Sequence, residues 1–254
     1  MRVGKWLKPV LLFVALLALW QAAVHLFNIP TFLLPSPTQV AVRMSEIPNQ
    51  LLDNTLVTLY EVLAGFSLAV VVGVVLATLI VHSRFLAESL YPLLIITQVT
   101  PQVAIAPLLV IWFGYGDLPK IIIAFFVAFF PMVVNTATGL LRVPEELLDL
   151  MRGLRTPRWR IFVMIRLPNA LPYIFAGMRI SITLAVIGAV VGEFVAANEG
   201  LGYLVFNGTA NNDTALTFAA IFILAAIGIT LFWIVGGLRR LIVPWARDPD
   251  EGDA

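Results

Sequence analysis

The stretch RVPEELLDLMRGLRTPRWRIFVMIR, residues 142–166, is the one densely charged block in an otherwise apolar chain. It carries six arginines and three acidic residues in 25 positions, and apolar segments lie on both sides of it. A helix needs about 20 apolar residues to cross ~30 Å of hydrocarbon, and both flanking segments are long enough. The pattern predicts a polytopic membrane protein that presents one basic, amphipathic loop to the cytosol.

Composition independently indicates an integral membrane protein. Hydrophobic residues make up 60% of the 254 residues and charged residues only 12%, whereas soluble domains carry roughly 25% charged residues. The mean hydropathy is +0.96. A net charge of +1 gives no reason to expect a nucleic-acid partner. With no cysteine and two histidines, His25 and His82, the chain lacks the residues for a disulfide framework, a thiolate metal site or a multi-histidine metal site. We expect no metal and no cofactor.

Long apolar segments predict an all-α protein with six transmembrane helices. Their approximate ranges are 10–27, 58–81, 90–113, 119–141, 171–197 and 216–240. Basic residues precede the first segment, as they do in a signal peptide. The run at 10–27 is 18 residues long, which exceeds the 7–15 of a typical signal-peptide core. We therefore expect an uncleaved first helix, with a cleaved signal peptide as the alternative.

Basic residues predict the orientation. Lysine and arginine are enriched in the cytoplasmic loops of multi-pass proteins. With both termini in the cytoplasm, thirteen of the sixteen basic residues fall on that side, six of them in the loop 142–170. Arg43 and Lys120 are then outside, and Arg179 lies within a predicted helix. We therefore expect both termini to be cytoplasmic.

The same pattern divides the chain into four parts. Residues 1–30 form a cytoplasmic N-terminus and the first helix, and residues 31–57 form an external loop with a short amphipathic helix around 38–52. Residues 58–243 form a core of five helices that includes the cytoplasmic region 142–168. Residues 244–254 form a cytoplasmic tail.

Within the charged loop, Pro144 is suited to the first turn of a helix, where its missing N–H costs nothing. The acids Glu145, Glu146 and Asp149 then lie near the positive N-terminal end of that helix, and Pro157 is expected to end it. A short helix of this kind could lie in a groove of a soluble partner. The alternative is an ordinary basic loop that rests on anionic lipid.

The segment from Asp149 to Pro168 resembles the EAA motif of importer permeases of the ATP-binding-cassette (ABC) class. That motif reads Glu-Ala-Ala, three residues, Gly, nine residues, then Ile-x-Leu-Pro. Here the Glu-Ala-Ala positions hold Asp149, Leu150 and Met151, and the glycine position holds Arg155. The end of the motif matches at Ile165, Leu167 and Pro168.

Further matches extend over residues 34–243 in order. They are LPSPTQV at 34–40, YEVLAGFSLAVVVGVVL at 60–76, IAPLLVIWFGYGDLPK at 105–120, FFPMVVNTATGL at 129–140 and GEFVAANEGLGYLV at 192–205. All of them resemble the nitrate, sulfonate and taurine branch of that class, which also includes permeases for thiamine-precursor pyrimidines and riboflavin.

The resemblance implies a type I importer permease with a MetI-like core of five helices plus one N-terminal helix, in the bacterial cytoplasmic (inner) membrane. It implies a permease homodimer, cytosolic ABC ATPase subunits that bind a coupling helix at about 145–157, and an extracytoplasmic substrate-binding protein. The chain has no GxxxxGK[ST] phosphate loop, so we expect a transport subunit without its own ATPase. The predicted coupling residues are Glu145, Glu146, Asp149, Leu150, Arg152, Leu154, Pro157 and Arg158.

Polar residues inside the spans are candidates for a translocation pathway, because they are costly in lipid. Glu193 lies near the outer end of the fifth span. Arg179 lies roughly 21 Å away along the same helix, so the two cannot pair within it. Polar residues and prolines also interrupt the third and fourth spans. The predicted pathway residues are Gln98, Gln102, Asn135, Arg179 and Glu193; structural pairs and packing kinks are the alternative.

An anion route would be expected to carry excess positive charge, yet Arg179 is offset by Glu193 in the predicted spans. This balance favours a neutral or weakly charged heteroaromatic substrate of the pyrimidine or riboflavin type over nitrate, sulfonate or taurine. No catalytic set is evident. A secondary transporter driven by an ion gradient and a membrane scaffold subunit remain alternatives, although the internal repeat that many secondary transporters have is not visible.

Overall fold

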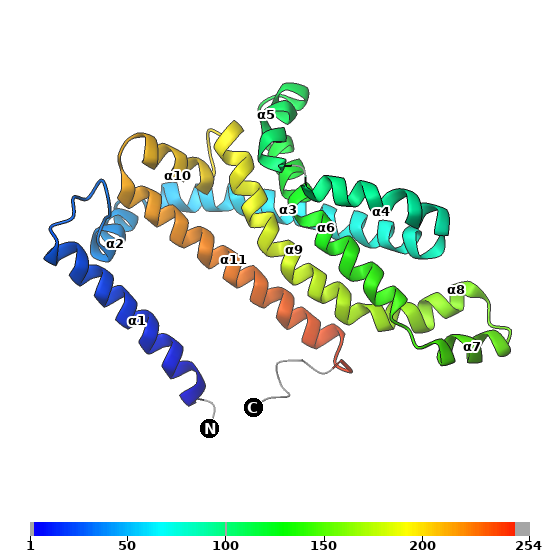
Figure 1. The fold of residues 1–254 in the computed structure, drawn as a ribbon. Helices are drawn as coiled ribbons and strands as arrows, with labels where there is room; N and C mark the ends of the chain where they lie inside the picture. Colours follow the sequence, from blue (N-terminus) through cyan, green and yellow to red (C-terminus); the bar gives the residue numbers. More distant parts are fainter. Residues whose placement is uncertain (1–2, 100, 247–254) are drawn as a thin grey trace. The chain divides into compact units, whose positions relative to one another are not determined.

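The computed structural model describes residues 3–99 and 101–246, and nearly all of them are helical (Figure 1). By contact clustering the chain forms two compact units. One comprises Met1–Val57 and Asn198–Ala225, and the other comprises Thr58–Ala197 and Ala226–Ala254. The predicted all-α class is confirmed.

Four helical stretches of the described chain are long and apolar enough to cross a membrane. They are Pro48–His82 (α3), Asp117–Leu141 (α6), Arg158–Val195 and Thr214–Ile242 (α11). The third of these stretches joins the helices Arg158–Ile161 (α8) and Leu167–Ala196 (α9) through a π-helical turn, Phe162–Arg166 (η1). The shorter apolar stretches Val10–Leu26, within α1 (Val3–Leu26), and Ala104–Phe113 account for the other two predicted spans.

The third predicted span, 90–113, is broken into two helices. Helix α4 (Arg84–Val99) ends before Pro101, which is the N-cap of α5 (Gln102–Phe113). The backbone of Pro101 is extended, with φ of −66° and ψ of 102°, so the chain is not helical at this residue. The expected interruption of the fourth span is wrong, since α6 continues through Pro131.

In the first unit, a capping box starts helix α2 (Pro37–Glu46). The Ser36 hydroxyl accepts a hydrogen bond from the Gln39 backbone N–H at 3.3 Å, and the Ser36 backbone N–H donates to the Gln39 side chain at 2.8 Å. The predicted short helix 38–52 is therefore two elements, because α3 begins at Pro48. Helix α10 (Leu201–Ala210) lies between α9 and α11 in the chain.

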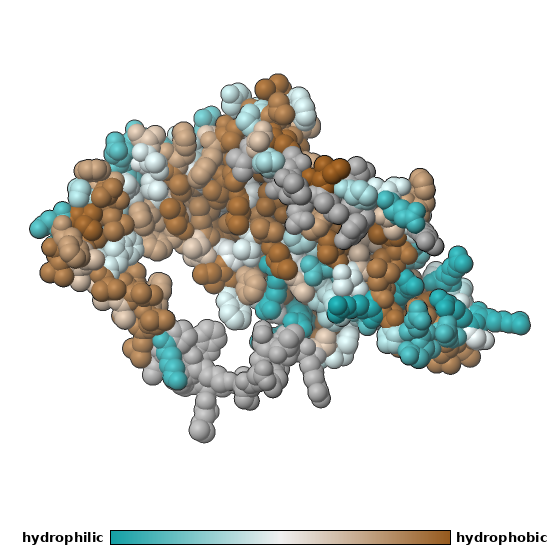
Figure 2. All heavy atoms as spheres, viewed as in Figure 1, coloured by the Kyte–Doolittle hydropathy of each residue, from teal (hydrophilic) through white to brown (hydrophobic). Residues whose placement is uncertain are grey.

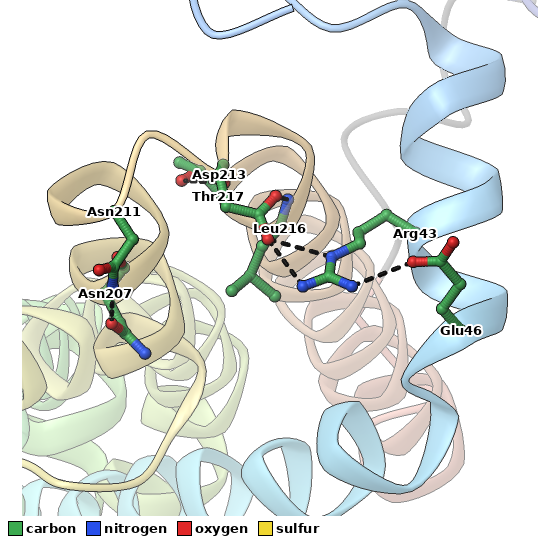
Figure 3. A network of polar contacts seen from close by, with 7 residues as sticks. All are labelled: Arg43, Glu46, Asn207, Asn211, Asp213, Leu216 and Thr217. Atoms are coloured by element: carbon green, nitrogen blue, oxygen red, sulfur yellow. Dashed lines mark hydrogen bonds and ion pairs between the residues drawn. The ribbon is translucent and has the colours of Figure 1, made fainter.

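An ionic network joins α2 to the start of α11 within this unit (Figure 3). Arg43 donates from Nε and Nη2 to one oxygen of Asp213, at 3.1 and 2.8 Å, and from Nη1 to Glu46 at 3.0 Å. The other Asp213 oxygen accepts the Leu216 backbone N–H at 3.0 Å and so caps α11. The hydrogen bond to Glu46, followed by that to Asp213, raises the pKa of Arg43.

In the second unit, α6 and α9 run side by side and pack along their length (Figure 1). A Cβ added at Gly188 would lie 2.7 Å from the Ala124 Cα, and one at Gly192 would lie 2.9 Å from the Lys120 Cα. Only glycine permits this backbone approach. Gly65 and Gly73 of α3 likewise abut Ala124 and Met132 of α6. Gly65, Gly73, Gly188 and Gly192 are therefore close-packing positions between helices.

Gly188→Ala should destabilise the protein by about 1–3 kcal/mol, because the Ala124 backbone cannot move aside. The measurement is the thermal unfolding midpoint of the detergent-purified protein. Gly237→Ala is the matched control, since a Cβ there meets nothing within 4 Å. Equal midpoints for both variants would contradict the tight α6–α9 contact.

Candidate functional site: an exposed loop helix and a buried polar cluster

The charged loop contains helix α7, Glu145–Gly153, which begins directly after Pro144. Its first turn carries Glu145 and Glu146, where acids interact favourably with the helix dipole. The helix is four residues shorter than the predicted 145–157. Pro157 does not end it; instead it is the N-cap of α8.

A Schellman motif ends α7. The Thr156 N–H bonds to the Met151 carbonyl at 3.0 Å, and the Arg155 N–H bonds to the Arg152 carbonyl at 2.9 Å. This motif requires a left-handed residue at the position of Arg155, whose φ is +52°. Glycine adopts that conformation without steric cost, which explains the glycine at this position of the EAA motif. The chain keeps the backbone geometry although the glycine is replaced by arginine.

Contacts between α6 and α9 hold the two ends of the loop. The Asn169 side chain donates to the carbonyls of Gly139 and Arg142 at 3.0 and 3.1 Å. A Cβ at Gly139 would lie 2.9 Å from the Ala170 Cα, so the helices almost touch where the loop leaves them. The loop is therefore mounted on a closely packed part of the second unit.

All eight predicted coupling residues are exposed on this loop: Glu145, Glu146, Asp149, Leu150, Arg152, Leu154, Pro157 and Arg158. Leu150 and Leu154 are 59% and 67% exposed, while Leu148 is buried. Asp149 pairs with Arg152 at 2.8 Å. An exposed amphipathic helix presents an apolar face to which another protein can bind. The role of these eight residues in coupling stays a prediction.

Arg155→Gly should stabilise the protein by about 1 kcal/mol, because an L-residue at a left-handed position costs roughly 1–2 kcal/mol and glycine relieves part of that cost. For a chain of this size the midpoint should rise by about 2–4 °C. Thermal unfolding of the purified variant measures this rise. An unchanged or lower midpoint would show that the Arg155 side chain makes stabilising contacts of its own.

At the opposite ends of α6 and α9, a cluster of buried polar side chains joins three helices. The Thr58 hydroxyl of α3 donates to Glu193 of α9 at 2.6 Å. Lys120, in the first turn of α6, pairs with Glu61 of α3 and lies 3.2 Å from Asp117. Thr58, Glu61, Lys120 and Glu193 are at most 2% exposed, whereas the Asp117 side chain is half exposed.

Sequence reasoning identified Glu193 but missed Thr58, Glu61 and Lys120. Lys120 was expected on the external side, at the start of the span 119–141, and the structure buries it in the first turn of α6. A signal was available: Thr58 and Glu61 are three residues apart, as are Asp117 and Lys120, so each pair shares one helix face. Only the fold shows that these faces meet.

Two of the other predicted pathway residues, Arg179 and Asn135, make their printed contacts away from Glu193. Arg179 stacks its guanidinium over the Phe232 ring, 4.7 Å from the centroid, and the guanidinium packs on Gly236. Asn135 donates to the Pro131 carbonyl of its own helix at 2.8 Å. The side chains of Gln98 and Gln102, like residue Thr100, lie outside the described part of the chain. Their place in a pathway stays a prediction.

Lys120→Met should destabilise the protein by about 3–5 kcal/mol, because it leaves the buried Glu61 carboxylate without its cation. The double variant Glu61→Gln/Lys120→Met removes the unpaired charge and should recover at least half of that loss. A double-mutant cycle of unfolding midpoints measures the coupling. Additive effects would mean that the pair contributes no net interaction.

Bundled apolar helices, an exposed loop helix and buried polar groups define a membrane-embedded transport subunit. Residues 69–248 match the family "Binding-protein-dependent transport system inner membrane component", and the chain belongs to that family. It is the permease subunit of an ABC importer. The expected resemblance and the MetI-like fold are confirmed.

Two curated relatives cover nearly the whole chain. The riboflavin transport system permease protein RibX of Chloroflexus aurantiacus is 40% identical over 91% of this chain and 87% of its own length. The formylaminopyrimidine transport permease protein ThiX of Halalkalibacterium halodurans is 35% identical over 95% of this chain and 96% of its own. Relatives at 28–30% identity include permeases named for aliphatic sulfonates and nitrate.

Among solved structures, the chain is similar to one from inward-facing MetNI, the methionine ABC transporter. The TM-score is 0.67 at 17% identity, covering 76% of this chain and 95% of the other. At this identity the likeness establishes the fold alone.

Proposed function

We propose that this permease admits a neutral or weakly charged heteroaromatic vitamin precursor, of the pyrimidine or riboflavin type, to the bacterial cytoplasm. An extracytoplasmic binding protein delivers the substrate. Cytosolic ATPase subunits supply the energy by binding α7. Two copies of the permease form the membrane part, with both termini in the cytoplasm. Nitrate, a sulfonate or taurine is the competing substrate class.

The observation that carries the coupling role is the construction of the loop. Helix α7 exposes Leu150 and Leu154 beside charged groups, and it ends in a Schellman turn whose left-handed residue, Arg155, stands at the glycine position of the EAA motif. Asn169 binds both the end of α6 and the loop. A force applied to α7 by a partner therefore reaches α6 and α9 through short, well-packed contacts.

The charge balance of the helices supports the substrate class. The structure adds Glu61 and Lys120 to Arg179 and Glu193, and these four side chains comprise two acids and two bases. Lys120 and Glu61 neutralise each other. These four side chains carry no excess of positive charge that would attract an anion. RibX and ThiX are named for riboflavin and formylaminopyrimidine.

The double charge reversal Asp149→Arg/Arg158→Glu should abolish ATP-driven uptake and reduce ATPase co-purification at least tenfold. Both side chains are exposed, so the protein should still fold and insert. Asp53→Arg is the matched control, because Asp53 is exposed near the beginning of α3, far along that helix from His82. Unimpaired uptake by the double variant would refute the coupling role of α7.

Substrate class is tested separately, by uptake into vesicles that contain the permease with its co-purified subunits and binding protein. Riboflavin, formylaminopyrimidine, nitrate and taurine are compared at equal concentration. We expect uptake of a heteroaromatic only, dependent on ATP. Uptake that collapses with an ionophore but survives ATP depletion would favour the secondary-transporter alternative, and absence of uptake would favour a scaffold.

A further inference from the structure

A recess of about 630 Å³ lies between the end of α3 and the loop elements α7, α8 and η1. Its lining includes His82, Arg152, Arg155, Arg158 and Arg166. Hydrophilic side chains gather over α7 and α8 on the face shown in Figure 2. Four arginines around one cavity are a high local concentration of positive charge.

Little on the described chain neutralises this charge. Asp149 pairs with Arg152, but no ion pair is seen for Arg155, Arg158 or Arg166 among the described residues. The acids of the first α7 turn do not line the recess. Arg155 faces it from a left-handed backbone position, which an arginine occupies only at a cost in conformational energy. The described residues therefore leave most of the positive charge of the recess uncompensated.

The walls of the recess are preformed. The His82 ring packs edge-on against Phe162, with the centroids 5.2 Å apart, so the end of α3 is joined to η1. The His82 Nδ1 donates to the Thr78 carbonyl at 2.9 Å, which leaves its other ring nitrogen available. Val81 and Phe162 also pack on the core cluster around Leu140 and Ala170. A ligand that enters the recess would therefore bind to walls that are already in place.

Apolar side chains next to the recess indicate what kind of anion it takes. Trp159, Val163 and Met164 of α8 and η1 are 64%, 49% and 64% exposed. Arg160 stacks on Trp159, 5.3 Å from the ring centroid. These elements begin the apolar stretch Arg158–Val195, so the arginines lie where a membrane-spanning helix leaves the hydrocarbon. Exposed tryptophan and basic residues at this level are typical of the lipid headgroup region.

We infer that the recess binds the phosphate group of an anionic phospholipid, whose acyl chains lie against Trp159, Val163 and Met164. Guanidinium groups bind phosphate oxygens through paired, charge-assisted hydrogen bonds. The lipid neutralises the arginines and stabilises the loop that carries α7. Arg152 and Arg158 also belong to the proposed coupling residues, so the inference rests on Arg155, Arg166 and His82, which do not.

The test uses the protein purified from its native membrane with its bound subunits, in phosphatidylcholine vesicles. Spin-labelled phosphatidylglycerol and phosphatidylcholine report the immobilised fraction by electron paramagnetic resonance. Wild type should prefer phosphatidylglycerol. Arg155→Gly should lower that preference about fivefold, as expected for one arginine near a membrane surface, and Arg155→Gly/Arg166→Gln should abolish it. Glycine suits the left-handed backbone, so the single variant remains folded.

Arg160→Gln is the matched control, because it removes one positive charge of the same loop that does not line the recess. It should keep the wild-type preference. Equal losses in all variants, or no preference in the wild type, would overturn the inference. Displacement of the labelled lipid by inorganic phosphate alone would assign the recess to a soluble phosphate instead. A preference that appears only after bound subunits are removed would make it a protein docking surface.

Discussion

The close approach of α6 and α9 is the constraint on which the second unit depends. At Gly139, Gly188 and Gly192 the backbone of one helix meets that of the other, leaving no room for a side chain. Small residues allow this contact, and in a lipid environment packing rather than hydrophobic burial holds helices together. The pair carries the exposed loop at one end and the buried polar cluster at the other, so both candidate sites share one rigid support.

The helices can bury this polar cluster because its side chains pair with one another. A single carboxylate or ammonium in a span is costly, yet Glu61, Lys120, Glu193 and Thr58 form contacts among α3, α6 and α9. Removing one partner leaves the other charge buried, so the network ties the three helices to one another. Lys120 of the cluster lies about 32 Å along α6 from Leu141, where the loop begins, at 1.5 Å per residue. A movement at either end is therefore transmitted by helices that cannot easily separate.

The loop shows how a motif can lose a residue and keep its shape. Arg155 occupies the position where the EAA motif has glycine, and the backbone there is still left-handed. The hydrogen bonds of Thr156 and Arg155 to Met151 and Arg152 impose that conformation on whatever residue is present. Comparison of letters alone counts a mismatch, while the geometry shows a retained turn with an added positive charge.

The sequence by itself determined the membrane class, the helical segments and the charged loop, because apolar length and charge placement are local properties of a chain. It also predicted the break between α4 and α5, since Pro101 acts on its immediate neighbours. It overestimated the effect of Pro131, because a helix that packs along its length can continue through proline. Only the tertiary structure decided that Lys120 is buried against Glu61, that Glu193 meets Thr58, and that four arginines line one recess with His82. Each of these contacts joins residues far apart in the chain, and their meeting depends on which helix faces pack together.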